Sequence, residues 1–306
     1  MKRIFGVLSP VVTPFRDDLS PDPDRFVRHC KWLVANGVGL AVFGTNSEAN
    51  SISVDERIEL LERLVDAGVD PARMMPGTGC CAFPDTVRLT AHAVKLGCAG
   101  VLMLPPFYYK GVSDEGLFRS YAEVIERVGD ARLAIYVYHI PPVSQVPITL
   151  GLIERLLERY PQAIAGVKDS SGDWNNTKAM LDRFASGGFD VFAGSETFLL
   201  ANLRNGGKGC ISATANVNPA AIHGLYASWQ QPDADTQQER LDAVRKTFQR
   251  YPMIPALKGA IAHWGSYPAW RRMRPPLVEL EGAQYEALVR ALEAVQFQMP
   301  GLGAGR

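Results

Sequence analysis

Short apolar runs bounded by glycine or proline recur along the chain. Two examples are Gly-Leu-Ala-Val-Phe at residues 39–43 and Ile-Ala-Gly-Val at residues 164–167. Strands covered on both faces carry such continuous runs, whereas half-exposed strands alternate apolar and polar residues. The pattern predicts eight buried strands, at residues 4–12, 39–43, 73–77, 100–104, 133–138, 164–168, 190–193 and 209–212.

Apolar residues return at helical spacing between these runs. Ser53 and Glu56 form a capping box at the start of one helical segment. Gly68 and Gly97 stand where helices commonly end. The pattern predicts eight helices between the strands, at residues 24–36, 54–67, 85–96, 114–128, 150–160, 175–185, 197–205 and 219–229.

Strictly alternating strands and helices predict an α/β fold, a (β/α)8 TIM barrel. The alternative is an open doubly wound sheet, but no G-x-G-x-x-G follows the first strand. Strand signals stop after residue 229, and residues 233–251, 255–265 and 282–297 read as helices. We therefore expect a barrel over residues 1–229 and a C-terminal helical region over 230–306. Residues 301–306 are expected to be frayed.

Composition excludes several classes of partner. The 306 residues are 47% hydrophobic, and 32 basic residues balance 32 acidic ones. Without a basic field, a polybasic helix or a long apolar segment, we expect neither nucleic acid nor a membrane as partner. The N-terminus has no apolar signal-peptide core. Five cysteines, of which Cys80 and Cys81 are adjacent, fit reduced thiols in a cytoplasmic protein.

Lys168 closes the run at 164–168 and is followed by Asp169-Ser170-Ser171-Gly172. Most strand-end lysines extend to solvent. The alternative is an amine held in a desolvated pocket, where it attacks a carbonyl in its neutral form. Active sites of these barrels lie at the carboxyl ends of the strands. The other strands end in phenols, hydroxyls, a histidine and a glutamate. These groups are the loop at 44–48, Tyr108, Tyr138, His139, Ser195, Glu196 and Ser212. Together with Lys168, they equip this end of the barrel for Schiff-base chemistry on a 2-oxo acid.

A purely structural role remains open for some of these residues. Tyr136 and Tyr138 lie two apart and share a face, so either can fill the barrel interior. His139 is interpreted as a structural loop histidine. The acidic residues are scattered without metal-ligand spacing, so neither a metal nor another cofactor is expected.

Several motifs, taken in order, carry a resemblance. They are Thr13-Pro14-Phe15, Gly44-Thr45-Asn46-Ser47-Glu48, Pro106-Phe107-Tyr108-Tyr109, Tyr138-His139-Ile140-Pro141, Gly166-Val167-Lys168-Asp169-Ser170-Ser171-Gly172, Ile211-Ser212 with Ala215-Asn216, and Arg274-Pro275-Pro276-Leu277. Over nearly the whole chain they resemble the dihydrodipicolinate synthase / N-acetylneuraminate lyase family of class I, Schiff-base aldolases.

The resemblance implies a role for each matching residue. Lys168 forms an imine with pyruvate or a pyruvate-derived donor, and Tyr138 moves protons at that imine. Thr45 links the Tyr138 hydroxyl to Tyr108, which in the family is often supplied by a neighbouring subunit. The resemblance thus implies a homo-oligomer, usually a dimer of dimers. Backbone N–H groups of Thr45 and Asn46 hold the substrate carboxylate.

Further positions define the pocket and the departures from the family. Gly194 and Ile211 line the pocket, and Glu196 is left as a candidate acceptor for substrate hydroxyls. Asn46 and Ser47 replace the Thr and Gly of the family's usual G-T-T-G-E, so the relay's helper hydroxyl is Thr45 or Ser47. Val143 stands where the synthase branch has an arginine for a second carboxylate, which removes its bidentate partner.

The function expected from the sequence is a pyruvate-type Schiff-base lyase or aldolase. It acts on a 2-oxo-3-deoxy acid of sugar-acid or related origin through the Lys168 imine. A dehydratase using the same imine is the nearest alternative, and Val143 disfavours 4-hydroxy-tetrahydrodipicolinate synthase activity. A catalytically silent, ligand-binding barrel is the non-enzyme alternative, although such a protein should have lost Lys168 or Tyr138.

Overall fold

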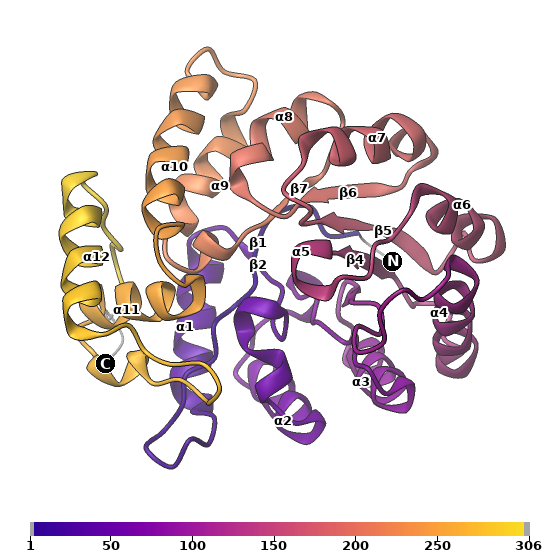
Figure 1. Cartoon of the computed structure of the whole chain (residues 1–306), viewed down its shortest axis with the longest axis horizontal. Helices are drawn as coiled ribbons and strands as arrows, with labels where there is room; N and C mark the ends of the chain where they lie inside the picture. Colours follow the sequence, from indigo (N-terminus) through magenta and orange to yellow (C-terminus); the bar gives the residue numbers. More distant parts are fainter. Residues whose placement is uncertain (1–2, 303–306) are drawn as a thin grey trace. The chain divides into compact units, whose positions relative to one another are not determined.

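The computed structural model describes residues 3–302, which form two compact units (Figure 1). Within the described residues, unit 1 is residues 3–6 with 70–211, and unit 2 is residues 7–69 with 212–302. The expected division at residue 229 is a different partition of the chain and stays a prediction. Of the tail expected to be frayed, residues 303–306 lie outside the described residues.

Unit 1 is built on a parallel sheet with the order β7-β6-β5-β4-β3 (Figure 1). Every residue of these five strands is buried, which is why continuous apolar runs predicted them. The strands are β3 (Val101–Met103), β4 (Ile135–His139), β5 (Ile164–Asp169), β6 (Asp190–Ala193) and β7 (Gly209–Ile211). The helices are α3 (Phe83–Lys95), α4 (Asp114–Val128), α5 (Pro141–Ser144), α6 (Leu150–Arg159), α7 (Trp174–Phe184) and α8 (Leu199–Arg204).

The prediction of a strand at residues 73–77 is wrong. Pro71–Arg73 form a 3-10 turn, which Asp70 caps by accepting the Ala72 N–H at 2.9 Å. Within the described residues, only bridge residues remain of the strand, at Met74 and at Gly77, which pairs in parallel with Leu102. Pro76 contributes a carbonyl to this bridge but has no N–H to extend the ladder.

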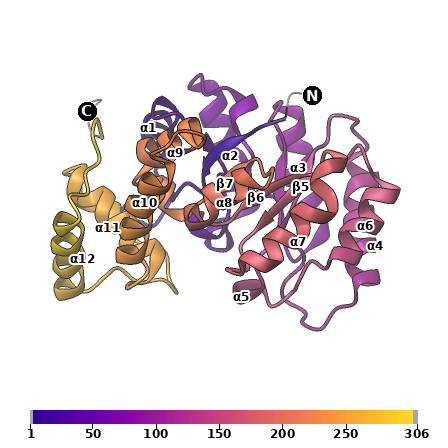
Figure 2. The same ribbon diagram turned by 90° about the horizontal axis from the view of Figure 1, so that it is seen from above.

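Unit 2 contains a short parallel pair of strands, β1 (Gly6–Ser9) and β2 (Gly39–Leu40). The first residue of β1, Gly6, is counted with unit 1. Its helices are α1 (Pro23–Ala35), α2 (Val54–Asp66), α9 (Pro219–Ser228), α10 (Ala234–Phe248), α11 (Met253–Trp264) and α12 (Gly282–Ala294). The last three confirm the helices expected after residue 229 and pack on one another (Figure 2). Apolar side chains such as Phe248, Leu257, Ile261, Leu288 and Leu292 form the core between them.

Local signals in the sequence are confirmed where they can be checked. Ser53 accepts the Glu56 N–H at 3.2 Å, and the Glu56 carboxylate accepts the Ser53 N–H at 2.8 Å. Gly68 and Gly97 adopt positive φ angles of 84° and 85° just after α2 and α3. All five cysteines are free thiols. Across residues 3–302, no helix combines the length and apolar character required to cross a membrane.

Candidate active site

Lys168 lies near the carboxyl end of β5 and does not extend to solvent. Its side chain is 2% exposed, which excludes the surface interpretation of a strand-end lysine. The parallel register places Lys168 beside Tyr138 on β4 and Phe192 on β6. The Lys168 Nζ lies 4.1 Å from the centroid of the Tyr138 ring. The amine and the phenol that the sequence singled out are therefore brought together in unit 1.

Asp169 fixes the backbone on the far side of Lys168. Its carboxylate accepts hydrogen bonds from the Ser171 N–H at 2.9 Å, the Ser171 hydroxyl at 3.1 Å, the Asn176 amide at 3.1 Å and the Thr177 hydroxyl at 2.6 Å. Two of these donors tie the end of β5 to the following loop, and the other two tie it to the first turn of α7. Sequence reasoning missed this anchor, although the polar run directly after Lys168 was a signal for it.

Gly194 lies where a larger residue would not fit. Its N–H donates to the Asp169 carbonyl at 2.7 Å, and a Cβ added to Gly194 would clash with that carbonyl and with the Ser170 hydroxyl. Glu196 lies nearby in the turn Glu196–Phe198 and is almost fully buried. Ile211 is fully buried as the last residue of β7. These residues are placed at strand ends, as the sequence predicted.

Tyr136 and His139, for which the sequence allowed a purely structural role, both make structural contacts. Tyr136 is fully buried, and its hydroxyl donates to Asp190 at 3.0 Å, so it is the tyrosine of the pair that fills the interior. Burial, and then the neighbouring carboxylate, raise the pKa of Tyr136. His139 Nδ1 accepts the Ile148 N–H at 2.9 Å. Burial lowers the pKa of His139, with Asp169 acting in the opposite direction.

Tyr108 lies on the surface of unit 1 rather than among the buried groups. It is 73% exposed and makes an edge contact with the equally exposed Tyr109 at 5.4 Å between ring centroids. Lys110 follows these phenols and donates to the carbonyls of Phe107 and Ser144, the latter at 2.8 Å. The loop is thus held against α5 while its phenols point outward.

The candidate carboxylate loop belongs to unit 2 and forms the short 3-10 turn Thr45–Ser47. The first hydrogen bond of the turn runs from the Ser47 N–H to the Gly44 carbonyl at 3.1 Å. The N–H groups of Thr45 and Asn46 precede that bond, so the turn itself does not use them. The Ser47 hydroxyl accepts the Gly44 N–H at 3.2 Å, and the Thr13 hydroxyl donates to the Ser47 carbonyl at 2.8 Å. The buried Ser47 therefore shapes the loop.

A buried ion pair, which sequence reasoning missed, follows this turn. Glu48 is buried in a left-handed conformation with φ of 58°, and its carboxylate contacts the Lys258 ammonium of α11. The Lys258 Nζ also donates to the Arg272 carbonyl at 2.9 Å. Burial lowers the pKa of Lys258 to about 8, against the opposing effect of Glu48, and burial raises the pKa of Glu48. Unit 2 thus holds a second buried lysine.

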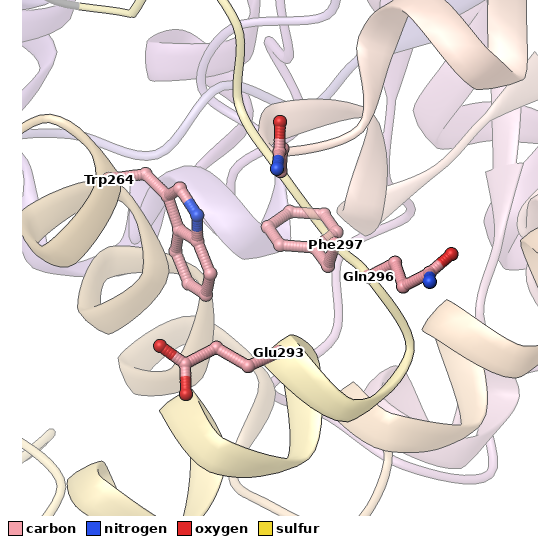
Figure 3. Close-up of a pocket in the computed structure, with 5 residues that line it drawn as sticks. Trp264, Glu293, Gln296 and Phe297 are labelled. Atoms are coloured by element: carbon pink, nitrogen blue, oxygen red, sulfur yellow. The ribbon is translucent and has the colours of Figure 1, made fainter.

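A surface cavity of about 640 Å³ lies in the C-terminal helical region (Figure 3). Trp264 and Phe297 form its aromatic side with ring centroids 5.0 Å apart, and Glu293, Gln296 and Gln298 complete the lining. None of the candidate site residues lines it, so its size alone does not mark a reaction site.

The fold and the site now define a class of protein. A dihydrodipicolinate synthase from Agrobacterium tumefaciens str. C58 aligns with a TM-score of 0.88 and 30% identity, covering 95% of this chain and 99% of that chain. YagE from E. coli K12, a prophage protein of the dihydrodipicolinic acid synthase family solved with pyruvate, gives 0.86 and 25%, covering 96% and 99%. The chain therefore has the expected (β/α)8 fold with a C-terminal helical extension, in the class of Schiff-base aldolases.

Sequence comparison gives the family itself. The model of the dihydrodipicolinate synthetase family matches residues 3–295. An uncharacterized DapA-like lyase of Chloroflexus aurantiacus is 33% identical over 294 residues, which are 95% of this chain and 96% of that protein. The chain belongs to the dihydrodipicolinate synthetase family and is a lyase, which confirms the resemblance and removes the alternative of a catalytically silent barrel.

Proposed function

We propose that this lyase reversibly cleaves a 2-oxo-3-deoxy acid, of sugar-acid or related origin, through an imine on Lys168 and releases pyruvate. The observation that carries the proposal is the buried Lys168 amine beside the Tyr138 ring at the end of β5. The similarity to YagE, whose structure contains pyruvate, supports a 2-oxo acid as the donor.

Covalent catalysis on Lys168 divides the reaction into easier steps. The neutral amine attacks the 2-oxo carbon, and the carbonyl oxygen leaves as water to give a protonated imine. The bond between carbons 3 and 4 breaks, its electron pair forms an enamine, and the hydroxyl on carbon 4 loses its proton to become an aldehyde. The enamine takes a proton at carbon 3, and water releases pyruvate and the amine. We assign the proton transfers to Tyr138.

The remaining roles follow the resemblance. Thr45 and Asn46 bind the substrate carboxylate through backbone N–H groups, and Ser47 shapes their turn through its bond from Gly44. Thr45 connects the Tyr138 hydroxyl to Tyr108. The exposed position of Tyr108 supports its delivery to a neighbouring copy, and hence a homotetramer built as a dimer of dimers.

The pocket walls and the acceptor are assigned in the same way. Gly194 and Ile211 line the pocket beside the imine, and Glu196 accepts hydrogen bonds from substrate hydroxyls. Val143 lies on α5, where it is 61% exposed and offers no guanidinium to a second carboxylate. We therefore favour a sugar-acid substrate over the synthase reaction, and we place the enzyme in the cytoplasm.

Trapping of the imine tests the mechanism. The protein is incubated with pyruvate, reduced with borohydride, digested and analysed by mass spectrometry. The adduct is expected on Lys168 and absent from Lys168→Ala, while Lys178→Ala, which changes an exposed lysine of α7, keeps it. An adduct on another lysine, with the buried Lys258 as the first to inspect, would overturn the assignment.

A substrate screen separates the lyase from the dehydratase. Each 2-oxo-3-deoxy acid is incubated with the enzyme, and pyruvate is measured alongside consumption of the substrate. A lyase releases one pyruvate for each substrate molecule consumed. A dehydratase keeps the bond between carbons 3 and 4, so consumption of substrate without pyruvate would assign that activity instead.

A further inference from the structure

Unit 2 buries a lysine that the proposed chemistry does not use. Lys258 is fully buried in α11, and its Nζ contacts the Glu48 carboxylate, the Arg272 carbonyl at 2.9 Å and the Phe15 ring at 4.5 Å from the centroid. These contacts surround the amine on several sides. The arrangement suits a group that holds a neighbour in place rather than one that reacts.

Glu48 is the neighbour that needs to be held. A residue other than glycine in the left-handed region costs about 1–3 kcal/mol, and it persists where the surroundings fix it. Glu48 has a φ of 58° and closes the preceding turn by donating its N–H to the Thr45 carbonyl at 3.2 Å. The ion pair to Lys258, together with a hydrogen bond from the Arg274 backbone, fixes this side chain at the point where the turn ends.

A second cation from the same part of the chain holds the residues that follow. Arg274 donates to the Ser51 carbonyl at 2.6 Å and to both carboxylate oxygens of Glu56 at 2.6 and 2.9 Å. Ser51 in turn donates its N–H to the Glu48 carbonyl at 2.8 Å. The segment from Glu48 to Glu56 is thus held at both ends, and Lys258 acts at the end adjoining the turn Thr45–Ser47.

We propose that Lys258 is a positioning residue, which fixes the turn Thr45–Ser47 through its ion pair with Glu48 in the conformation that binds the carboxylate of the 2-oxo acid. The inference rests on the proposed function, because that function makes this turn the carboxylate site. Lys258 itself touches neither substrate nor imine. Its loss should weaken capture of pyruvate more than it slows chemistry on bound substrate.

Two variants separate positioning from simple charge balance. Lys258→Met keeps the length of the side chain but leaves Glu48 without its cation. The double variant Glu48→Gln with Lys258→Met removes both charges, and replacing both partners of a buried pair is often neutral for stability. If the pair only balances charge, the double variant should restore both stability and pyruvate binding.

The measurement is the pyruvate concentration that gives half-maximal borohydride trapping on Lys168. In Lys258→Met it should rise by about tenfold, the equivalent of about 1.4 kcal/mol, while the maximal trapping rate stays close to that of the wild type. The double variant should recover the melting temperature but not the pyruvate affinity. Lys178→Met, which removes an exposed pair with Asp182, serves as the control and should change neither value.

The outcomes distinguish this inference from the function beneath it. If the wild type forms no adduct on Lys168, the proposed function fails. If the wild type forms the adduct and both variants trap pyruvate at the wild-type half-saturation, only the positioning role fails. Loss of the folded state in both variants would assign the pair to stability and overturn the proposal.

Discussion

The Nζ atom of Lys168 lies 4.1 Å from the centre of the Tyr138 ring, across two strands that pair in register. The face of an aromatic ring attracts a cation at this distance. A protonated imine carries its charge close to the same nitrogen, so the Tyr138 ring is placed to favour it. In the proposed reaction, the hydroxyl of the same side chain is assigned the proton transfers.

Tyr138→Phe separates these two contributions. Phenylalanine keeps the ring face but lacks the hydroxyl, so turnover should fall by about 10²–10⁴, the usual contribution of general acid–base catalysis. The pyruvate adduct on Lys168 should still form, more slowly. Steady-state pyruvate release and borohydride trapping measure the two effects. Tyr160→Phe, which removes a surface hydrogen bond to Glu126, should behave as wild type. Wild-type turnover in Tyr138→Phe would count against the relay.

Asp169→Ala tests the anchor behind Lys168. The substitution leaves the Thr177 hydroxyl and the Ser171 N–H without their acceptor, and hydrogen bonds to charged groups contribute about 1.5–3 kcal/mol each. The free energy of unfolding should fall by about 3 kcal/mol, and trapping on Lys168 should slow because the end of β5 is loosened. Chemical denaturation and adduct formation are the measurements.

Asp182→Ala is the matched control for that experiment. It removes an exposed carboxylate of α7 whose pair with Lys178 contributes about 0–1 kcal/mol. A loss of stability in Asp169→Ala no larger than this control would show that the hydrogen bonds around Asp169 do not anchor the strand.

The sequence predicted the fold where a single element determines its own pattern. β5 and β6 are buried on both faces, so Val167 and Val191 belong to apolar runs that are visible without any partner. The prediction of a strand at 73–77 was wrong because the hydrogen bonds of this segment depend on Leu102 of another element and because Pro76 lacks an N–H. Apolar character alone does not distinguish a strand from isolated bridges.

The site was predictable to the same extent. Lys168 and Tyr138 each end an apolar run, so the barrel rule brings them to one mouth. No pattern in the sequence predicts the pair of Glu48 and Lys258, because it depends on how α11 packs on a turn that is distant in the sequence. The bond from Tyr136 to Asp190 is similar: sequence showed that either tyrosine could fill the interior, and only the partner carboxylate decides which one does.

Asn216→Ala should destabilise the protein without changing a reacting group. The Asn216 side chain accepts the Val12 N–H at 2.9 Å and donates to the carbonyls of Pro10 and Ala213 at 3.0 and 2.9 Å. Alanine leaves three buried backbone groups unpaired, at about 1–3 kcal/mol for each group that finds no water. We expect a loss of about 3 kcal/mol in the free energy of unfolding, measured with denaturant.

Asn205→Ala provides the comparison for Asn216. Asn205 is exposed after α8 and donates to the Ala201 carbonyl at 2.8 Å, which water can replace. Its substitution should change stability by about 0.5 kcal/mol or less. Equal effects of the two substitutions would mean that Asn216 does not tie the loop after β1 to residue 213.

His29 should make the protein sensitive to acid. The ring is buried between Trp32 and Trp270, with centroids 5.6 and 5.1 Å away, and burial lowers the pKa of His29 from 6.5 to about 3. Because the folded-state pKa is lowered, the stability it contributes is present above pH 6.5. It is lost as the pH falls from 6.5 toward 3, since the unfolded chain binds the proton first.

His29→Phe removes this titration while keeping an aromatic ring of similar size. Between pH 6.5 and 5 the wild type should lose about 2 kcal/mol relative to the variant, because one pKa unit corresponds to about 1.4 kcal/mol. Denaturant unfolding at half-unit pH steps measures the free energy of unfolding of both proteins. The difference between the two curves cancels the titration of all other groups. Parallel curves for His29→Phe and the wild type would show that the His29 ring is protonated as readily in the folded protein as in the unfolded chain.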